Sequence, residues 1–101
     1  MIDLVTKQKE VLENKKNAGL RVDSMSEEFC RVHAEVTEAF EAWLYKEDNL
    51  GEELADIIIY CMGIAELNGI NLEDEITTKM ENFKKRHYVK VGNGYKKMVK
   101  E

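Results

Sequence analysis

Two short runs, Glu35-Val-Thr-Glu38 and Glu53-Leu-Ala-Asp56, each place two carboxylates three residues apart. On a helix, residues at this spacing point the same way from adjacent turns. A break lies between the runs at residues 46–51, and if it folds the two helices antiparallel, all four acidic groups converge. Four uncompensated carboxylates at close range repel one another, which pushes each toward protonation. A divalent cation removes this repulsion, and hard oxygen ligands favour Mg²⁺ or Mn²⁺.

Length and composition indicate one small helical domain. The chain has 101 residues, of which 44% are hydrophobic and 35% charged, and it contains no proline. Abundant helix formers without a helix breaker predict an all-α fold in a single domain, residues 1–101. A chain of this length buries only a modest core, and small domains often add to it by forming oligomers.

The charge of the chain narrows its possible partners. The formal net charge is −5, and a polyanion needs a dominant basic surface, so we expect no nucleic-acid polymer as partner.

The most apolar run, residues 57–65, is too short to cross a bilayer, and the first residues lack the long apolar run of a signal peptide. We therefore expect a cytoplasmic protein without membrane contact, in which Cys30 and Cys61 are buried free thiols.

The sequence predicts four helices followed by a tail or hairpin at 91–101. The expected helices cover residues 2–17, 24–45, 50–68 and 71–86. Ser24 and Glu27 have the spacing of an N-terminal capping box, and Asn71 is a candidate cap of the fourth helix. The connection between the second and third helices is short, which favours an antiparallel pair. In the tail, the pair Asn93-Gly94 indicates the turn of a β-hairpin.

Helical periodicity predicts two apolar surfaces. At about 100° per residue, one stripe of the second helix is formed by Phe29, Val32, Val36, Phe40 and Trp43. We expect core packing for Phe40 and Trp43, with stacking on a base as the alternative, and Glu35 and Glu38 at the edge of the stripe. The third helix is apolar over a wider surface, formed by Leu54, Ile57, Ile58, Cys61, Ile64 and Ala65 and continued by Ala55, Ile59 and Met62. One core needs only a stripe, so the surplus predicts a subunit interface.

The acidic pairs favour one kind of metal site. A single pair is common on a solvated helix face, but two pairs beside apolar stripes are harder to explain, since such charges are usually paired or metal-bound. Di-iron sites in helical bundles combine Glu with Glu-x-x-His, and neither His33 nor His87 has a Glu three residues before it. An all-carboxylate set therefore favours Mg²⁺ over iron and zinc.

The paired motif and its surroundings resemble a known family. Glu35-x-x-Glu38 followed by Glu53-x-x-Asp56 is similar to the ExxE and ExxD motifs of the MazG-like, all-α nucleoside triphosphate pyrophosphohydrolases. The resemblance covers about residues 24–90. It implies a four-helix bundle-like fold and a homodimer or dimer of dimers, with sites at subunit interfaces.

The resemblance also implies an activity and roles for individual residues. The activity is Mg²⁺-dependent cleavage of a (d)NTP between the α and β phosphates, which yields a nucleoside monophosphate and pyrophosphate and cleanses the nucleotide pool. The implied metal ligands are Glu35, Glu38, Glu53 and Asp56. Lys79 and Asn82 match a K-x-x-N element that faces phosphate or sugar, and Lys85 or Arg86 is a further phosphate contact. Glu38 is our choice of general base. Tyr60 either binds at the site or closes the edge of the core.

Other interpretations stay open. A dUTP- or dCTP-specific hydrolase and a phosphoribosyl-ATP pyrophosphohydrolase share the acidic motif and differ in the base pocket. In a different class, a metal-free helical dimer acting as a regulatory or interaction module has the same wide apolar face. Such a module neither binds Mg²⁺ nor releases pyrophosphate, so pyrophosphate release with and without Mg²⁺ separates the two classes.

Overall fold

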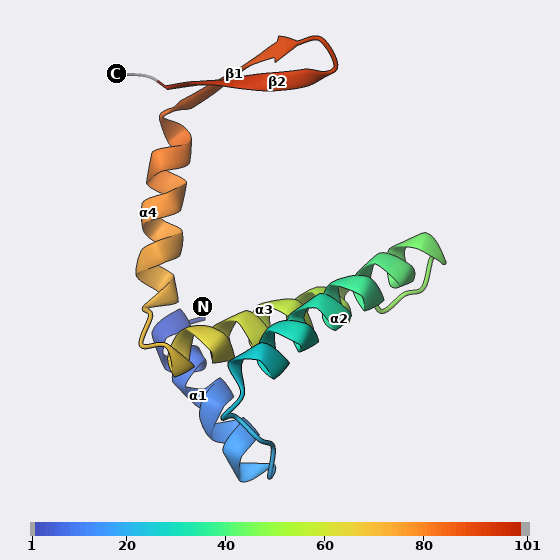
Figure 1. The fold of residues 1–101 in the computed structure, drawn as a ribbon, viewed down its shortest axis with the longest axis vertical. Coiled ribbons are helices and arrows are strands. Elements are labelled where there is room, and N and C mark those ends of the chain that lie inside the picture. Colours follow the sequence, from blue (N-terminus) through green and yellow to red (C-terminus); the bar gives the residue numbers. More distant parts are fainter. Residues whose placement is uncertain (1, 100–101) are drawn as a thin grey trace.

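Four helices and a C-terminal hairpin make up the fold (Figure 1). The computed structural model describes residues 2–99. In chain order the elements are α1 (Leu4–Asn17), α2 (Met25–Leu44), α3 (Leu50–Leu67), α4 (Leu72–Lys84), β1 (Arg86–Val91) and β2 (Gly94–Val99). The predicted all-α class, with four helices and a short hairpin, is confirmed.

Capping side chains set where the helices begin. The Ser24 hydroxyl accepts a hydrogen bond from the backbone N–H of Glu27 at 3.3 Å. The Asn71 side chain accepts one from the backbone N–H of Asp74 at 3.1 Å. Each bond satisfies an amide that has no partner inside its own helix. After α1, Gly19 adopts a φ of 82°, the left-handed conformation that ends a helix at little steric cost.

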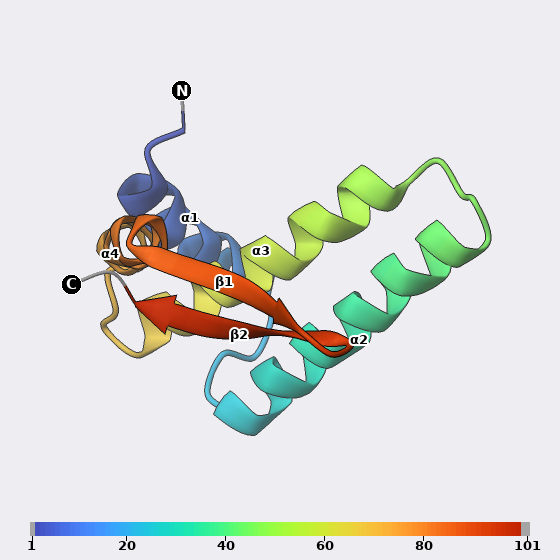
Figure 2. The same ribbon diagram turned by 90° about the horizontal axis from the view of Figure 1, so that it is seen from above.

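The helices form an open arrangement. α2 and α3 run antiparallel side by side, and α1 packs against α3 (Figures 1 and 2). α4 contacts mainly α1, projects away from the α2–α3 pair and carries the hairpin at its far end (Figure 1). The radius of gyration is 17.0 Å, whereas a compact domain of this length has about 13 Å. Among the helices within residues 2–99, none is both long and apolar enough to cross a membrane.

The core is small and consists mostly of small residues. The buried apolar residues are Ala39, Ala42, Met62 and Ala65. Alanines on α2 allow its backbone to approach α3 closely, whereas a core of large side chains would hold the helices apart. α4 has 13 residues, none of them buried, and an isolated helix of that length is marginal in water.

The aromatic stripe of α2 does not enter this core. Phe29, Val36, Phe40 and Trp43 are between 48% and 63% exposed. The expected core packing of Phe40 and Trp43 is therefore wrong within one chain. The reason is that α2 turns Ala39 toward α3, and Phe40, the next residue, lies about 100° further round the helix.

Both cysteines are exposed, so the prediction of buried thiols was also wrong. Cys30 follows the buried Glu28 by two residues, which places it on the opposite side of α2. Cys61 directly precedes the buried Met62 and therefore lies beside the contact line of α3.

The surplus apolar surface of α3 is exposed as well. Leu54, Ile58 and Ile59 are all exposed. The last two line an apolar groove of about 400 Å³ between α3 and α1, together with Val11 and Met62 of the facing sides. Exposed apolar residues that line a groove are typical of protein–protein contacts and of ligand-binding grooves.

The hairpin is a two-stranded antiparallel ribbon. Val91 pairs with Gly94, so the two turn residues are Gly92 and Asn93. Gly92 takes a φ of 59°, which is favourable for glycine at the first position of such a turn. The Asn93-Gly94 motif therefore located the hairpin but placed its turn one residue too late.

Candidate metal site

Three carboxylates meet on the facing sides of α2 and α3. One oxygen each of Glu35, Glu38 and Glu53 lies within 4.8 Å of the other two. The first two occupy adjacent turns of α2, and Glu53 lies in the first turn of α3. The short loop after α2 returns the chain antiparallel and brings these turns together. We call these three residues the acidic group.

Two oxygens of the acidic group are buried without a partner. Neither Oε2 of Glu35 nor Oε2 of Glu53 has a hydrogen-bond partner in the described part of the chain. The other oxygen of Glu53, Oε1, accepts a hydrogen bond from the Asn49 side-chain amide at 3.2 Å. A buried oxygen without a donor is destabilising. A cation between the carboxylates would satisfy both oxygens, so the residues present fit a divalent metal with oxygen ligands.

Burial is the main cause of the raised pKa of Glu35 and of Glu53. The neighbouring Glu38 raises the pKa of both further, by carboxyl contact and by its charge, and the charge of Asp56 adds to this. The ionised forms of Glu35 and Glu53 are therefore disfavoured, first by burial and then by the neighbouring carboxylates. A bound cation would reverse that effect because it favours the charged form.

Asp56 stands outside the acidic group. It lies one turn after Glu53 on α3, and its side chain is exposed. Its charge acts on Glu35 and Glu53, but the three-residue group within 4.8 Å does not include it. Asp56 therefore stays a predicted ligand, whereas the structure brings the other three predicted ligands together.

Removing one charge from the acidic group is expected to stabilise the metal-free protein. Glu53→Gln keeps the side-chain shape but removes part of the repulsion, so Tm in a chelator should rise by a few degrees. The same variant should lose most of the increase in Tm that Mg²⁺ gives the wild type, because a ligand stabilises only the state that binds it. Thermal melts followed by circular dichroism measure both effects. Glu41→Gln, on the exposed side of α2, is the matched control, and equal melts for both variants would contradict the expectation.

The region around the acidic group is short of positive charge. Between residues 32 and 78 the sequence has twelve Asp or Glu and a single basic residue, Lys46. Lys15 lies 3.0 Å from the Glu28 carboxylate, and Arg31 lies 3.7 Å from that of Glu27. Lys15 and Arg31 are thus engaged with other carboxylates, which leaves Lys46 as the one basic residue of this segment. A triphosphate bound here needs positive charge from another source.

The predicted substrate-binding residues lie in two different places. Lys79 and Asn82 are exposed on α4, and Arg86 begins β1, with its guanidinium 5.9 Å from the centre of the Phe83 ring. Because α4 projects away from the α2–α3 pair (Figure 1), one chain does not bring these three residues to its own acidic group.

Tyr60 lies on α3, facing α1. Its ring is half-buried and carries the Lys15 ammonium 4.3 Å above its centre. Lys15 fits there because Gly63, one turn later on α3, has no side chain: a Cβ at this position would come 3.0 Å from the ammonium nitrogen. This placement supports the expectation that Tyr60 closes the edge of the core.

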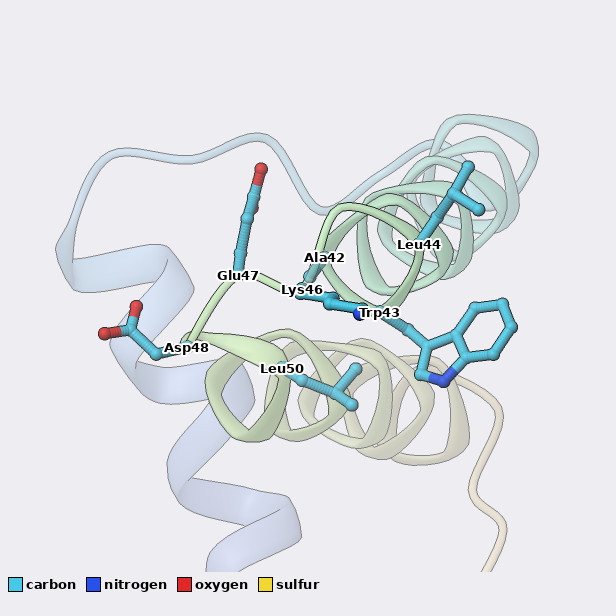
Figure 3. A pocket seen from close by; sticks show the side chains of 7 residues that line it. All are labelled: Ala42, Trp43, Leu44, Lys46, Glu47, Asp48 and Leu50. Carbon is cyan, nitrogen blue, oxygen red and sulfur yellow. The ribbon is translucent and has the colours of Figure 1, made fainter.

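A hollow of about 630 Å³ lies at the turn between α2 and α3 (Figure 3). It is lined by Ala42, Trp43, Leu44, Lys46, Glu47, Asp48 and Leu50. Ala42 lies one turn after Glu38, and Leu50 lies three residues before Glu53. Figure 3 shows Trp43 and Leu50 projecting to one side of the turn and Asp48 to the other. Sequence reasoning missed this hollow because it assigned Trp43 to the core.

Comparison with known proteins supports the sequence resemblance. Among models of protein families, that of the MazG-like family matches residues 21–101. A search of curated proteins found no match, and a search of solved structures found none either.

Proposed function

This chain belongs to the MazG-like family, and from that premise we propose that it is a Mg²⁺-dependent nucleoside triphosphate pyrophosphohydrolase. The reaction would cleave a (d)NTP between the α and β phosphates and cleanse the nucleotide pool of the cytoplasm. The observation that carries the proposal is the acidic group, in which one oxygen of each carboxylate lies within 4.8 Å of the others and Oε2 of Glu35 and of Glu53 are buried without a partner. Structural ion pairs do not explain it, because among residues 2–99 no salt bridge involves these three residues.

The residues of the site have separable roles. Glu35, Glu38 and Glu53 would hold Mg²⁺, or Mn²⁺ in its place, with Asp56 as a fourth ligand. When bound, the metal neutralises phosphate oxygens and lowers the pKa of coordinated water. Asn49 fixes the orientation of Glu53 through its hydrogen bond at 3.2 Å. This bond leaves the unpaired oxygen of Glu53 free for a ligand.

Glu38 is the best placed of the three carboxylates to accept a proton. It is exposed, whereas Glu35 and Glu53 are half-buried. In our mechanism Glu38 removes a proton from the attacking water, the phosphoanhydride bond breaks, and pyrophosphate departs. Positive groups must balance the charge of the departing pyrophosphate. Lys79 and Arg86 stay our candidates for this charge and Asn82 for a neutral contact to phosphate or sugar, and all three require a second copy of the chain.

We further propose that the working form is a homodimer or a dimer of dimers. The open shape, the exposed aromatic stripe of α2 and the exposed apolar residues of α3 support this. A single chain leaves too little apolar surface buried to expect a stable monomer. Pairing two copies through these surfaces would supply the missing core.

The hollow at the α2–α3 turn is our candidate site for the nucleobase. Trp43 is 63% exposed at its margin, and stacking on an aromatic ring contributes about 1–3 kcal/mol per base. Trp43→Ala is therefore expected to raise KM by roughly ten-fold, with a smaller effect on kcat. Steady-state kinetics checks this, with size-exclusion chromatography to show that assembly persists. An unchanged KM would remove Trp43 from the base site.

The decisive test of the activity is pyrophosphate release from a panel of substrates. The panel contains canonical and modified (d)NTPs, including dUTP and dCTP, together with phosphoribosyl-ATP. We expect release of pyrophosphate with Mg²⁺ and none in a chelator. The preferred substrate then separates a general house-cleaning enzyme from the more specific alternatives. No release from any member of the panel would leave the regulatory helical dimer as the better hypothesis.

A further inference from the structure

Charge is segregated along this chain. Residues 79–101 contain eight Lys or Arg and two Glu, whereas residues 32–78 contain twelve acidic residues and one Lys. The basic residues lie mainly on the second half of α4 and the hairpin, whereas nine of the twelve acidic residues lie between residues 35 and 66, on α2, α3 and the loop between them. In the structure these regions lie apart (Figure 1). Opposite charges of this size attract across an interface and steer association.

The hairpin has two different faces, and neither is covered. On one face Tyr88 is opposite Lys97, and Lys90 is opposite Tyr95. The other face carries the apolar side chains of Val89, Val91 and Met98, all exposed. Among residues 2–99, no ion pair involves Lys90 or Lys97. A lone two-stranded hairpin is at best marginally stable in water, so this one needs a surface to pack on.

α4 has the same need. Its apolar residues Ile76, Met80 and Phe83 are exposed on one side of the helix, and no residue of α4 is buried. The Phe83 ring lies 6.1 Å from that of Tyr88, so the apolar side of α4 meets the hairpin on the face that carries Lys90 and Lys97. We call residues 72–99 the arm.

We infer that the arm of one copy docks along α2 and α3 of a second copy, so that its basic hairpin covers the partner's acidic group. This inference rests on the proposed function for the role of the hairpin, but not for the contact itself. The apolar side of α4 would pack on the exposed aromatic stripe of the partner's α2. The lysines of the hairpin would then supply the positive charge that the surroundings of the acidic group lack.

The dimensions of the arm agree with this arrangement. A helix of 13 residues is about 20 Å long, and a strand of six residues adds about 20 Å. The arm can thus span α2, whose 20 residues measure about 30 Å. Exchange of such an element between copies is a common route to a dimer. It also accounts for the separation of Lys79 and Asn82 from the acidic group of their own chain.

The first test is independent of activity. The full chain is prepared as an equal mixture of ¹⁴N and ¹⁵N protein, refolded together, and treated with a carbodiimide that joins lysine directly to carboxylate. Mass spectrometry then assigns each link to one chain or to two. We expect links between chains that join Lys90, Lys96 or Lys97 to acidic residues 35–56. Links confined to one chain would overturn the inference. It would also be overturned if these lysines formed no link between chains and their modification were reduced only by an added single-stranded oligonucleotide.

The second test uses complementation between two defective variants. Glu38→Gln has an intact arm and a defective acidic group. The double variant Lys90→Ala, Lys97→Ala has a defective arm and an intact acidic group. Each alone should be nearly inactive. An equal mixture, refolded together, should recover about a quarter of wild-type activity, because half the dimers are mixed and each has one complete site. Lys9→Ala, Lys16→Ala, two exposed lysines of α1, is the control and should stay active.

The two tests fail in different ways. If the wild type releases no pyrophosphate, the proposed function fails, and cross-linking still decides whether the arm is exchanged. If the wild type is active but the mixture shows no recovery, the arm does not act on the partner's site. A monomeric wild type in sedimentation experiments would overturn the inference as well.

Discussion

Replacing Glu38 with Gln is expected to lower kcat by about 10²–10⁴-fold, the usual effect of losing a general base. The amide has nearly the same shape but cannot accept the proton of the attacking water. It is also a weaker metal ligand than a carboxylate. The helical circular dichroism should stay unchanged, because Glu38 is exposed and forms no salt bridge among residues 2–99. Pyrophosphate release at saturating substrate and Mg²⁺ measures the effect.

The control for this variant is Glu41→Gln, which removes the same charge from the next turn of α2. Glu41 is exposed and lies outside the acidic group, so the activity of the Glu41→Gln variant should stay close to that of the wild type. Asp56→Asn tests the fourth predicted ligand and should also reduce turnover by orders of magnitude. Wild-type activity in both Glu38→Gln and Asp56→Asn would exclude the assigned site.

A charge on the exposed apolar surface is expected to abolish assembly. Val36 lies on the aromatic stripe of α2, and it is 48% exposed in the single chain. If the chain worked alone, Val36→Asp would change stability by about 0.5 kcal/mol or less, as surface substitutions usually do. If two copies bury this stripe, the aspartate has no partner at the interface, and the dimer should dissociate and unfold. Sedimentation and thermal melts at several protein concentrations distinguish these outcomes.

Leu20→Asp is the matched control for the interface. Leu20 is 54% exposed, close to the 48% of Val36. It lies in the connection before α2 and not on the stripe. This variant should stay dimeric with a concentration-dependent Tm. A monomeric, folded and active Val36→Asp protein would show that the stripe is not an interface.

The elements of this fold were predictable because their determinants are local. Ser24 and Asn71 cap the helices as their side-chain chemistry predicts. The spacing of Glu35, Glu38 and Glu53 was enough to bring three carboxylates together, since a short loop fixes the antiparallel pairing of the two helices. Asp56 is only one turn further, yet the orientation of its side chain is not fixed by that spacing.

Which face of a helix meets which neighbour was not predictable in the same way. The period of α2 identifies the stripe of Phe40 and Trp43, but it does not say whether that stripe covers its own chain or a second copy. Ala39 and Ala42 face α3 and are buried, because small residues permit the two helices to approach closely. The direction of α4 depends on the two residues between Gly69 and α4, Ile70 and Asn71, which have no helical period. Sequence reasoning therefore identified Lys79 and Asn82 without showing their distance from the acidic group.

Binding of Mn²⁺, used in place of Mg²⁺, tests most directly whether the acidic group is a metal site. Electron paramagnetic resonance of free Mn²⁺ follows its loss from solution as protein is added, in the presence of an α,β-methylene nucleotide that resists cleavage. We predict binding by the wild type, competition by Mg²⁺, and strongly weakened binding by a variant with Glu35, Glu38 and Glu53 all replaced by Gln. Equal Mn²⁺ binding by the two proteins, or none by the wild type, would contradict the account.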